Sequence, residues 1–375
     1  SYVWAALGTS GLHRTTAATS GFSTANVPAA PASGQISMVG YANGYLLAGG
    51  SAGTLSTRKN SLWRVDTPTG ASTLTLIKTH ANNSFVWEGV ASGRSCVYAF
   101  GNSGSNGEVY KISFDPTTGT LSTAASSATM LPEGETIHSL YLYAGIVVLG
   151  TGRGVRIGQA DGAGNIDYGP LVETDWPVRA LEPQDRFCWF GWTKYDATNS
   201  GLGRIDLGYQ TDTLMPAWAS DLMTVDTSQG DVVAAITFAP YGYIAGQRPA
   251  VRMFSVAGEG VYIEDPGARV ESGEIRTGAI RFSTSEPKTA RSMDIRHHAL
   301  PAGGAVAAEM QRDSSGVWDV IGSSSTTGSY GPSAPLDLDD LEAEAMEFEF
   351  TLHRPDNDGE DFGLSPELTR WTAKA

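Results

Sequence analysis

Short runs of alternating or apolar residues, rich in Val, Ile, Tyr, Thr and Trp, dominate the hydrophobic pattern of the chain. Gly, Asn, Asp and Pro interrupt these runs at intervals of about ten residues, which is typical of an all-β protein. An i, i+3, i+4, i+7 spacing of apolar positions with capping residues would indicate helices, and it is absent from nearly all of the sequence. The best candidate for a helix is Leu338–Met346, and an alternating strand follows it. The pattern therefore predicts an all-β fold.

One local motif recurs along the first 270 residues: a strand ends in a turn rich in Gly and Ser, and a second strand follows. The clearest copy is Leu149–Ile157. Successive copies are separated by 42, 51, 49, 41 and 67 residues, counted between their first glycines, which are Gly8, Gly50, Gly101, Gly150, Gly191 and Gly258. Most of these intervals match the roughly 40–50 residues of a four-stranded propeller blade.

Each copy also has the neighbouring strands that a propeller blade needs. An apolar strand precedes the turn, as in Ile36–Ala42, Phe85–Val90 and Ile137–Tyr143, and a more polar strand follows, as in Leu74–Lys78. Inner strands of a propeller pack blade against blade, whereas outer strands face water. The coils of a parallel β-helix, the competing architecture, are much shorter than this period. We therefore predict a β-propeller over residues 1–270 with about six blades, five or seven being the alternatives.

The repeat stops after Val270, and residues 271–375 show a different arrangement of strands. The pattern predicts strands there at 274–282, 290–297, 304–311, 317–322, 346–354 and 367–373. Ser323–Pro335 is rich in Ser, Gly, Thr and Pro, which is typical of a loop within a domain. We expect a separate β-sandwich, for which a jelly-roll topology is one option.

Charge and cysteine content narrow the classes of partner. The chain carries 40 Asp and Glu residues against 25 Lys and Arg, a formal net charge of −15. Nucleic-acid binding relies on clusters of Lys and Arg that neutralise phosphates, so we expect no nucleic-acid partner. No apolar run approaches the roughly 18 residues of a membrane span, so we expect no membrane partner. The two cysteines, Cys96 and Cys188, are too few for a disulfide scaffold, and we expect both to be reduced thiols.

Three stretches carry candidate catalytic or metal-binding residues, and each has a simpler structural interpretation. Gly49–Gly53 matches the G-x-S-x-G pattern of a nucleophile elbow, but a loop and a strand follow where the elbow requires a helix. Arg354–Asp361 concentrates oxygen ligands without the spacing of an EF-hand, so a solvated turn is favoured and a Ca²⁺ site is the alternative. His297 and His298 point to opposite faces of a strand and cannot hold one metal together. We therefore predict no catalytic residues, no metal and no cofactor.

Four aromatic residues in one predicted blade and the loop before it are the candidate binding residues, and they are Trp176, Trp189, Trp192 and Tyr195. Aromatic faces with neighbouring Asp and Asn side chains can stack on sugars and form a saccharide platform. Filling the core between blades is the commoner role of such residues and the competing interpretation. The S-x-D-x-G-x-T-W turns of a sialidase-type propeller are absent, and the sequence marks out no carboxylate pair for glycoside cleavage.

The C-terminal third carries two stretches that look like those of a known family. Gly273–Phe282 with Ser283–Lys288 is similar to a stretch G-x-I-x-T-G-x-I-R-F-x-T-x-E-P-K, and Ser365–Ala375 is similar to a closing strand P-x-L-x-R-W-T-x-x-A. In these stretches the chain resembles minor tail or tail-tip proteins of siphophages that infect Gram-positive, especially actinobacterial, hosts. A Gly-rich propeller before such a domain also fits that family. The acidic insert Leu336–Glu349 departs from the family pattern.

The resemblance implies a structural protein of the phage virion, extracellular and located at the tail tip. Its expected partners are other tail-tip proteins and a host-cell-surface receptor, either a saccharide or a protein. We expect several copies per virion, with a homotrimer as one arrangement. A large all-β chain without marked chemistry suits a binding scaffold, so we expect that the chain is not an enzyme. The alternatives are a propeller hydrolase or lyase that degrades cell-wall polysaccharide, and a secreted lectin.

Overall fold

The computed structural model is all-β, as the sequence pattern predicts, and its described part consists of strands, turns and loops. The described residues are 3–7, 12–15, 35–51, 60–66, 68, 73–143, 145–174, 177–184, 186–193, 200–212, 214–223, 233–239, 251–256, 260–263, 272–281, 286–353 and 368–374. The chain divides into two compact units, Ser1–Glu264 and Asp265–Ala375. The stretch read as a possible helix, Leu338–Met346, is a strand over most of its length. That part of the sequence-based prediction is wrong.

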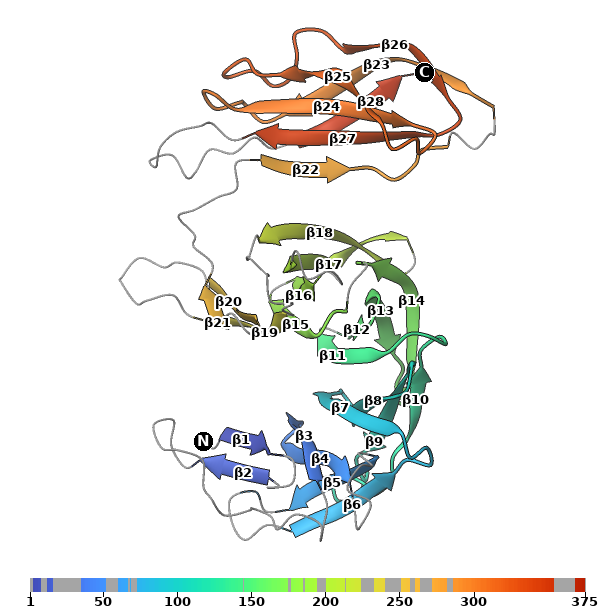
Figure 1. Ribbon diagram of the computed structural model, residues 1–375, viewed down its shortest axis with the longest axis vertical. Coiled ribbons are helices and arrows are strands. Elements are labelled where there is room, and N and C mark those ends of the chain that lie inside the picture. The colour runs from blue at the N-terminus through green and yellow to red at the C-terminus, as the bar shows by residue number, and fades with distance from the viewer. Residues whose placement is uncertain are drawn as a thin grey trace. The chain divides into compact units, whose positions relative to one another are not determined.

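Six antiparallel sheets form the described part of the first unit, and each is built from strands consecutive in the chain (Figure 1). Four of them have the four strands of a complete blade. Their strands are β3 (Gln35–Ala42), β4 (Tyr45–Ser51), β5 (Ser61–Asp66) and β6 (Thr73–Thr79); β7 (Phe85–Ser92), β8 (Cys96–Ser103), β9 (Asn106–Ser113) and β10 (Ser126–Met130); β11 (Ile137–Tyr143), β12 (Ile146–Thr151), β13 (Gly154–Ala160) and β14 (Ile166–Glu173); and β15 (Ala180–Gln184), β16 (Phe187–Thr193), β17 (Ser200–Asp212) and β18 (Met215–Met223). The sheets at the two ends have fewer described strands, namely β1 (Val3–Ala6) and β2 (Leu12–Thr15), and β19 (Val233–Ala239), β20 (Val251–Val256) and β21 (Gly260–Ile263).

The first strands of successive sheets contact one another, in the order β1, β3, β7, β11, β15 and β19. Neighbouring blades of a propeller meet in this way, because the first strand of each blade lies nearest the axis. Together with the four-stranded meanders, this contact order confirms the propeller class. The six sheets correspond to the six glycine-marked copies in the sequence. Closure of the ring stays a prediction.

The repeated glycines occupy positions where the second strand of a blade has no space for a side chain. A Cβ atom on Gly101 would lie 2.2 Å from the backbone oxygen of Val86 and 2.7 Å from the ring of Phe85, both on the inner strand of the same sheet. A Cβ atom on Gly50 would lie 1.8 Å from the backbone oxygen of Gln35. Glycine therefore recurs at these positions because the first two strands of each blade approach each other closely.

We expect Gly101→Ala to lower the free energy of unfolding by about 1–3 kcal/mol, the usual cost of forcing extra atoms into a packed site. The matched control is Gly162→Ala, because in the described part of the chain no atom beyond its two chain neighbours lies within 4 Å of the position that its Cβ would take. Urea denaturation of both variants, followed by circular dichroism, measures the difference. Equal stabilities for the two variants would contradict the close-approach explanation.

Apolar cores lie between successive sheets. The largest side chains in them include Trp87 and Phe85 on β7, Tyr98 on β8 and Phe190 on β16, each less than 2% exposed. Cys96 and Cys188 are also buried, and both thiols are free. Burial raises the pKa of each thiol, which keeps it neutral and unreactive at physiological pH.

The second unit is a sandwich of two antiparallel sheets with one core between them (Figure 1). In sheet order, the four-stranded sheet consists of β22 (Ser272–Arg276), β27 (Met346–His353), β24 (Ala305–Arg312) and β25 (Trp318–Ser324). The three-stranded sheet consists of β26 (Leu336–Ala343), β23 (Lys288–His297) and β28 (Leu368–Lys374). This arrangement confirms the predicted sandwich. A jelly roll has eight strands, and the described part of this unit has seven.

Trp371 on β28 lies half-buried against this core, with its ring centroid 5.3 Å from that of Phe348 and 5.6 Å from that of Phe350. We expect Trp371→Ala to destabilise the sandwich by about 2 kcal/mol, less than the loss of a fully buried Trp. Tyr330→Ala is the control, because that side chain is 66% exposed. The measurement is a thermal melt of each variant. An unchanged melting temperature for Trp371→Ala would show that its ring contributes no packing energy.

Candidate functional site

The structure describes one complete side chain among the four aromatic residues proposed from the sequence. Trp189 is half-buried in β16. Trp192 also belongs to β16, but its side chain lies outside the described part, as do the residues Trp176 and Tyr195. The proposed four-residue platform is therefore untested as a group.

Trp189 belongs to a row of side chains that crosses three strands of its blade. In the strand register Glu182 of β15 is opposite Trp189, and Trp189 is opposite Arg204 of β17. The Arg204 guanidinium carbon lies 5.5 Å from the centroid of the Trp189 ring, a cation–π contact. Directly opposed residues share a face of the sheet, so the blade presents a carboxyl group, an indole and a guanidinium side by side.

The opposite face of the same blade forms part of the apolar core. Cys188 and Phe190 flank Trp189 in β16, and both are completely buried against the β11–β14 sheet. Alternation along the strand therefore directs the row Glu182, Trp189 and Arg204 away from that core. Because β15–β18 is the fourth of the four-stranded sheets, we call this row the blade-four row.

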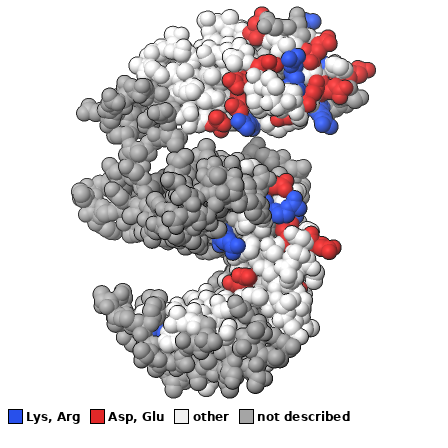
Figure 2. Space-filling model, in the orientation of Figure 1, with Lys and Arg blue, Asp and Glu red and all other residues white. Residues whose placement is uncertain are grey.

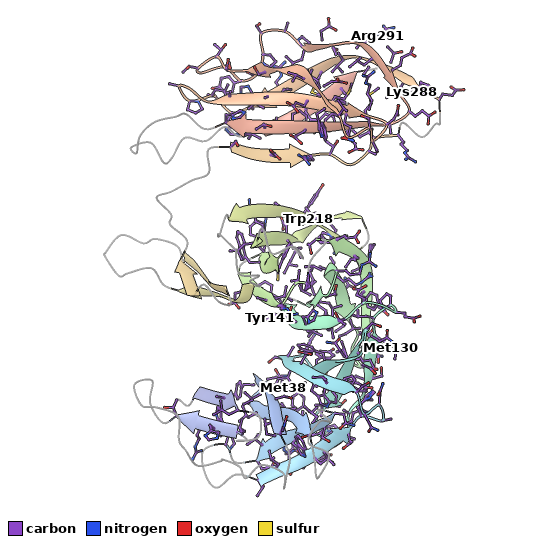
Figure 3. The ribbon with its side chains drawn as sticks, in the orientation of Figure 1. Met38, Met130, Tyr141, Trp218, Lys288 and Arg291 are labelled. Carbon is purple, nitrogen blue, oxygen red and sulfur yellow. The ribbon has the colours of Figure 1, made fainter. Side chains whose placement is uncertain are left out.

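Glu182 lies on the strand nearest the propeller axis, and its environment favours the protonated carboxyl. Burial raises the pKa of Glu182 above its ordinary value. Its charge in turn helps to raise the pKa of Tyr141 on β11, a contribution second to that of burial. Tyr141 is 40% exposed, and Figure 3 shows its place on the inner strand. A carboxyl group and a phenol therefore lie near each other on adjacent inner strands.

The raised pKa predicts how stability depends on pH. In the unfolded chain Glu182 has the ordinary carboxyl pKa, so above that pKa folding must bury a charge or retain a proton. This penalty is absent at pH values below the ordinary carboxyl pKa and grows as the pH rises through and above it. We therefore expect Glu182→Gln to raise the melting temperature more at pH 7 than at pH 4. The control is Glu173→Gln, because the Glu173 side chain is 54% exposed. If the change in melting temperature caused by Glu182→Gln were the same at pH 4 and pH 7, the burial of Glu182 would be contradicted.

Three inner strands each carry a bulged residue near the beginning of the strand, opposite the glycine-containing part of the second strand. The register against the second strand shifts at Ser37 in β3, at Glu88 in β7 and at His138 in β11. Ser37 and Glu88 are exposed, although Ile36 and Met38 beside Ser37, and Trp87 beside Glu88, are buried. A bulge redirects one side chain out of the regular alternation, so these strands place polar groups outside the core.

His138 is a neutral imidazole at physiological pH. Burial, and then the positive charge of Arg179, lower its pKa to about 4. Its Nε2 atom lies 3.1 Å from the hydroxyl of Thr136. The inner strands therefore offer a hydroxyl, a carboxylate and a neutral imidazole, which are hydrogen-bonding groups suited to a hydroxylated ligand.

Two of the other sequence candidates have structural roles. Ser51 lies within β4, completely buried, and its hydroxyl accepts a 2.8 Å hydrogen bond from the backbone of Gln35. His297 is 2% exposed, and its Nε2 atom lies 2.9 Å from the hydroxyl of Ser324. Neither residue has the geometry of a nucleophile or a shared metal ligand. The acidic stretch Arg354–Asp361 lies outside the described residues.

The described residues contain no group of three or more His, Cys, Asp and Glu side chains placed to hold a metal ion. Within the same residues, no helix has the length and apolar character needed to cross a membrane. Neither finding identifies a ligand. The candidate site therefore consists of the blade-four row and the polar inner strands.

Comparisons with known proteins give similarity of fold alone. No protein-family model matches the chain, and no curated protein sequence matches it. Among solved structures, exo-β-1,3-galactanase from Phanerochaete chrysosporium is 9% identical over 100% of this chain and 92% of its own, with a TM-score of 0.33. Hsv2 of Kluyveromyces lactis is 8% identical over 59% of this chain and 57% of its own, with a TM-score of 0.34. The computationally designed protein Ika4 is 16% identical over 50% of this chain and 94% of its own, with a TM-score of 0.33.

These comparisons correct one expectation from the sequence. We expected that the chain is not an enzyme, but its structural neighbours include glycoside hydrolases. The propeller architecture thus gives no ground for excluding catalysis, since one fold serves many functions. The side chains of the site have to be tested for both binding and cleavage.

Proposed function

We propose that this chain is a component of a phage tail tip and that its propeller binds a saccharide of the host cell surface. The observation that carries the binding proposal is the blade-four row. An indole face, a guanidinium and a carboxyl group side by side provide stacking and hydrogen bonding, which are the interactions that hold sugar rings.

The distribution of charge supports a neutral saccharide. In the view of Figure 2, the described Asp and Glu residues gather on the sandwich, whereas most of the described propeller surface is uncharged. With a net charge of −15, the chain as a whole repels polyanions. A neutral sugar meets no such barrier.

The sandwich supports the tail-tip part of the proposal. Both stretches that carry the phage resemblance contribute strands to it, β22 next to β27 and β28 next to β23. Just after β22, Thr277 donates its backbone N–H to the oxygen of Phe348, and Ile280 donates its own to Met346. The two stretches are thus parts of one folded domain, a unit that could attach to other tail-tip proteins in several copies.

Glycoside cleavage is the second candidate function, and the raised pKa of Glu182 in its partly buried position on β15 favours it. A glycosidase needs one carboxylic acid with a raised pKa to protonate the leaving oxygen, and a second carboxylate on the other side of the bond. Glu182 has the environment of the acid. Glu88, exposed on another inner strand, is a candidate for the carboxylate.

The experiment measures binding and cleavage in the same samples. The full chain is incubated with purified cell-wall polysaccharide from an actinobacterial host, and both retained protein and released reducing ends are followed over a day. We expect retention that falls at least tenfold with Trp189→Ala and is unchanged with Glu173→Gln. Release of oligosaccharide that Glu182→Gln abolishes would establish the cleavage candidate. Absence of both retention and release would overturn the saccharide proposal.

The tail-tip proposal has its own test. Antibodies raised against the chain are applied to phage particles purified from the source of the sequence and examined by electron microscopy. We expect label at the tail end distal to the capsid. Particles that lack the chain by mass spectrometry would overturn a virion location.

A further inference from the structure

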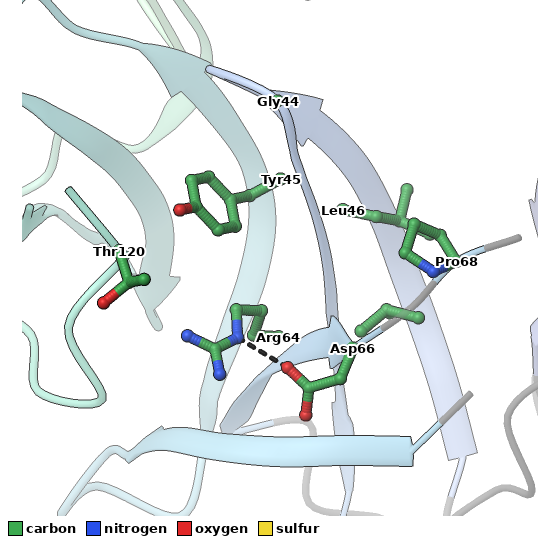
Figure 4. Close-up of a pocket in the computed structure, with 8 residues that line it drawn as sticks. Gly44, Tyr45, Leu46, Arg64, Asp66, Pro68 and Thr120 are labelled. Atoms are coloured by element: carbon green, nitrogen blue, oxygen red, sulfur yellow. Dashed lines mark hydrogen bonds and ion pairs between the residues drawn. The ribbon is translucent and has the colours of Figure 1, made fainter. Parts of the chain in front are cut away.

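A cavity in the propeller lies apart from the blade-four row. It has a volume of about 420 Å³ and is lined by Gly44, Tyr45, Leu46, Arg64, Val65, Asp66, Pro68 and Thr120 (Figure 4). These residues come from the β3–β4 turn, from β4 and β5, from the segment after β5 and from the loop between β9 and β10. Two neighbouring blades therefore contribute to one cavity. Small-molecule sites in proteins have volumes of about 300–1,000 Å³, and the lower part of that range suits one or two sugar rings.

The polar groups of the cavity belong to one face of the β3–β6 sheet. Leu47 is opposite Arg64 in the register of β4 and β5, so Tyr45 and Asp66, two residues away on each strand, lie on the same face. The Arg64 Nε atom donates a 2.7 Å hydrogen bond to the Asp66 carboxylate. Figure 4 shows the Tyr45 ring next to this ion pair, with Leu46 and Pro68 on the other side.

Contacts to the adjoining blade hold these side chains in place without a ligand. Arg64 Nη1 donates a 2.9 Å hydrogen bond to the backbone oxygen of Leu121. The backbone N–H of Leu121 in turn donates a 3.2 Å hydrogen bond to the hydroxyl of Tyr45. The loop itself is fixed, since the Asp115 carboxylate accepts from the backbone N–H groups of Thr117 and Thr118, each at 2.8 Å. A site that is ordered beforehand loses little conformational entropy when a ligand binds.

The charges of the cavity point to a ligand without net charge. Arg64 and Asp66 neutralise each other, so the lining attracts neither an anion nor a cation strongly. Burial opposes the charged form of Asp66, but hydrogen bonds from Thr75 and Arg64 outweigh it and hold the pKa of the carboxyl below its usual value. An ionised carboxylate accepts hydrogen bonds from hydroxyl groups, and a guanidinium donates to their oxygens.

We propose that this cavity binds a neutral saccharide unit, with Tyr45 contacting the apolar face of the sugar ring while Asp66 and Arg64 bind its hydroxyl groups. The proposal extends the saccharide-binding function to a second site, but its evidence is independent of the blade-four row. A second site on one chain would increase the avidity of the particle for a polysaccharide without any tighter contact.

The experiment uses the full chain and saturation-transfer difference NMR with four probes: methyl β-galactoside, methyl β-glucoside, methyl N-acetyl-β-glucosaminide and glucuronic acid. We expect at least one neutral probe to bind and its affinity to fall at least tenfold with Asp66→Asn. Asp294→Asn is the matched control, because Asp294 and Arg296 form an ion pair of 3.2 Å with the same two-residue spacing on β23. That control is expected to bind like the unaltered chain.

A second variant separates loss of the site from loss of folding. Thr120→Trp places a large ring at the exposed rim of the cavity and keeps the backbone hydrogen bond from Asp115 to Thr120. It loses only the exposed 2.7 Å hydrogen bond between the hydroxyls of Thr118 and Thr120, so it is expected to block binding while the melting temperature changes little. Binding that survives both Asp66→Asn and Thr120→Trp would overturn the proposal. The same conclusion follows if no neutral probe binds, if glucuronic acid binds best, or if Glu182→Gln rather than Asp66→Asn removes the signal.

Discussion

Replacing Glu135 by Ala is expected to lower the free energy of unfolding of the propeller by about 3–5 kcal/mol, the usual cost of leaving a buried charge without its partner. The Glu135 side chain is 3% exposed and accepts two hydrogen bonds of 2.8 Å, from Nε and Nη2 of Arg156. The same guanidinium donates to the backbone oxygen of Gly169 and stacks over the ring of Tyr168. These contacts hold Arg156 inside the protein when the carboxylate is gone.

The pair also joins two blades. Glu135 lies between β10 and β11, and its backbone oxygen accepts a 2.9 Å hydrogen bond from Gly107 at the start of β9. Its side chain binds Arg156 on β13 in the next sheet. Loss of the carboxylate therefore weakens the contact between blades as well as the charge balance.

The control for Glu135→Ala is Glu173→Ala. Arg153 and Glu173 form an ion pair of 2.7 Å, but both side chains are more than half exposed. Exposed pairs contribute about 1 kcal/mol or less. Urea denaturation of both variants, followed by circular dichroism, measures the two losses. Similar losses would show that burial adds nothing to the Glu135 pair, contrary to the argument above.

The blades of the propeller could be predicted from the sequence because crowding between strands requires glycine at one position in each blade. Gly50, Gly101 and Gly150 each stand where a Cβ atom would meet a neighbouring strand, so glycine recurs at the period of the blade. The apolar strands that contain these glycines are also recognisable, because β4, β8 and β12 are buried along almost their whole length. Expected and observed bounds agree completely for Ile137–Tyr143.

The sandwich was harder to predict at Leu338–Met346. Its cluster of Asp, Glu, Ala and Leu has high helix propensity and little β propensity. The chain nevertheless forms β26, because Ala290 and Met293 on β23 offer a strand edge and Leu338 becomes 1% exposed in the core. Tertiary contacts thus override local preference, and a single sequence does not reveal which edge is free.

The binding residues were only partly predictable. Trp189 was identified as an aromatic residue near other aromatic residues, but its neighbours Glu182 and Arg204 become adjacent only through strand pairing. The cavity lined by Tyr45, Arg64 and Thr120 was equally hard to predict, because these residues come from two blades and become neighbours only in the folded chain. One signal was available for it: Arg64 and Asp66 are two positions apart in the sequence, so they share a face of a regular strand. The bulges at Ser37, Glu88 and His138 left no such trace.

Replacing Trp87 by Ala is expected to cost about 3–5 kcal/mol, the range for removing a large aromatic residue from a core. Trp87 is 1% exposed on the inner strand β7, and its ring packs edge to face with Phe85 at 4.8 Å and with Tyr110 at 5.5 Å. It also fills the space beside Gly49 of the preceding blade, where a Cβ atom would lie 2.8 Å from Trp87. The side chain therefore supports the contact between two blades.

Trp87→Phe distinguishes loss of packing from loss of the indole N–H. Among the described residues, no group accepts a hydrogen bond from the buried Nε1 atom of Trp87, so we expect this donor to contribute nothing favourable to the folded state. Phe keeps one aromatic ring against Phe85 and Tyr110 and removes that unpaired donor, so we expect it to cost about 1–2 kcal/mol, clearly less than Ala. Denaturant titrations of the two variants give the comparison. Equal losses for Phe and Ala would mean that the indole is stabilised by its N–H group and not by the ring contacts between the blades.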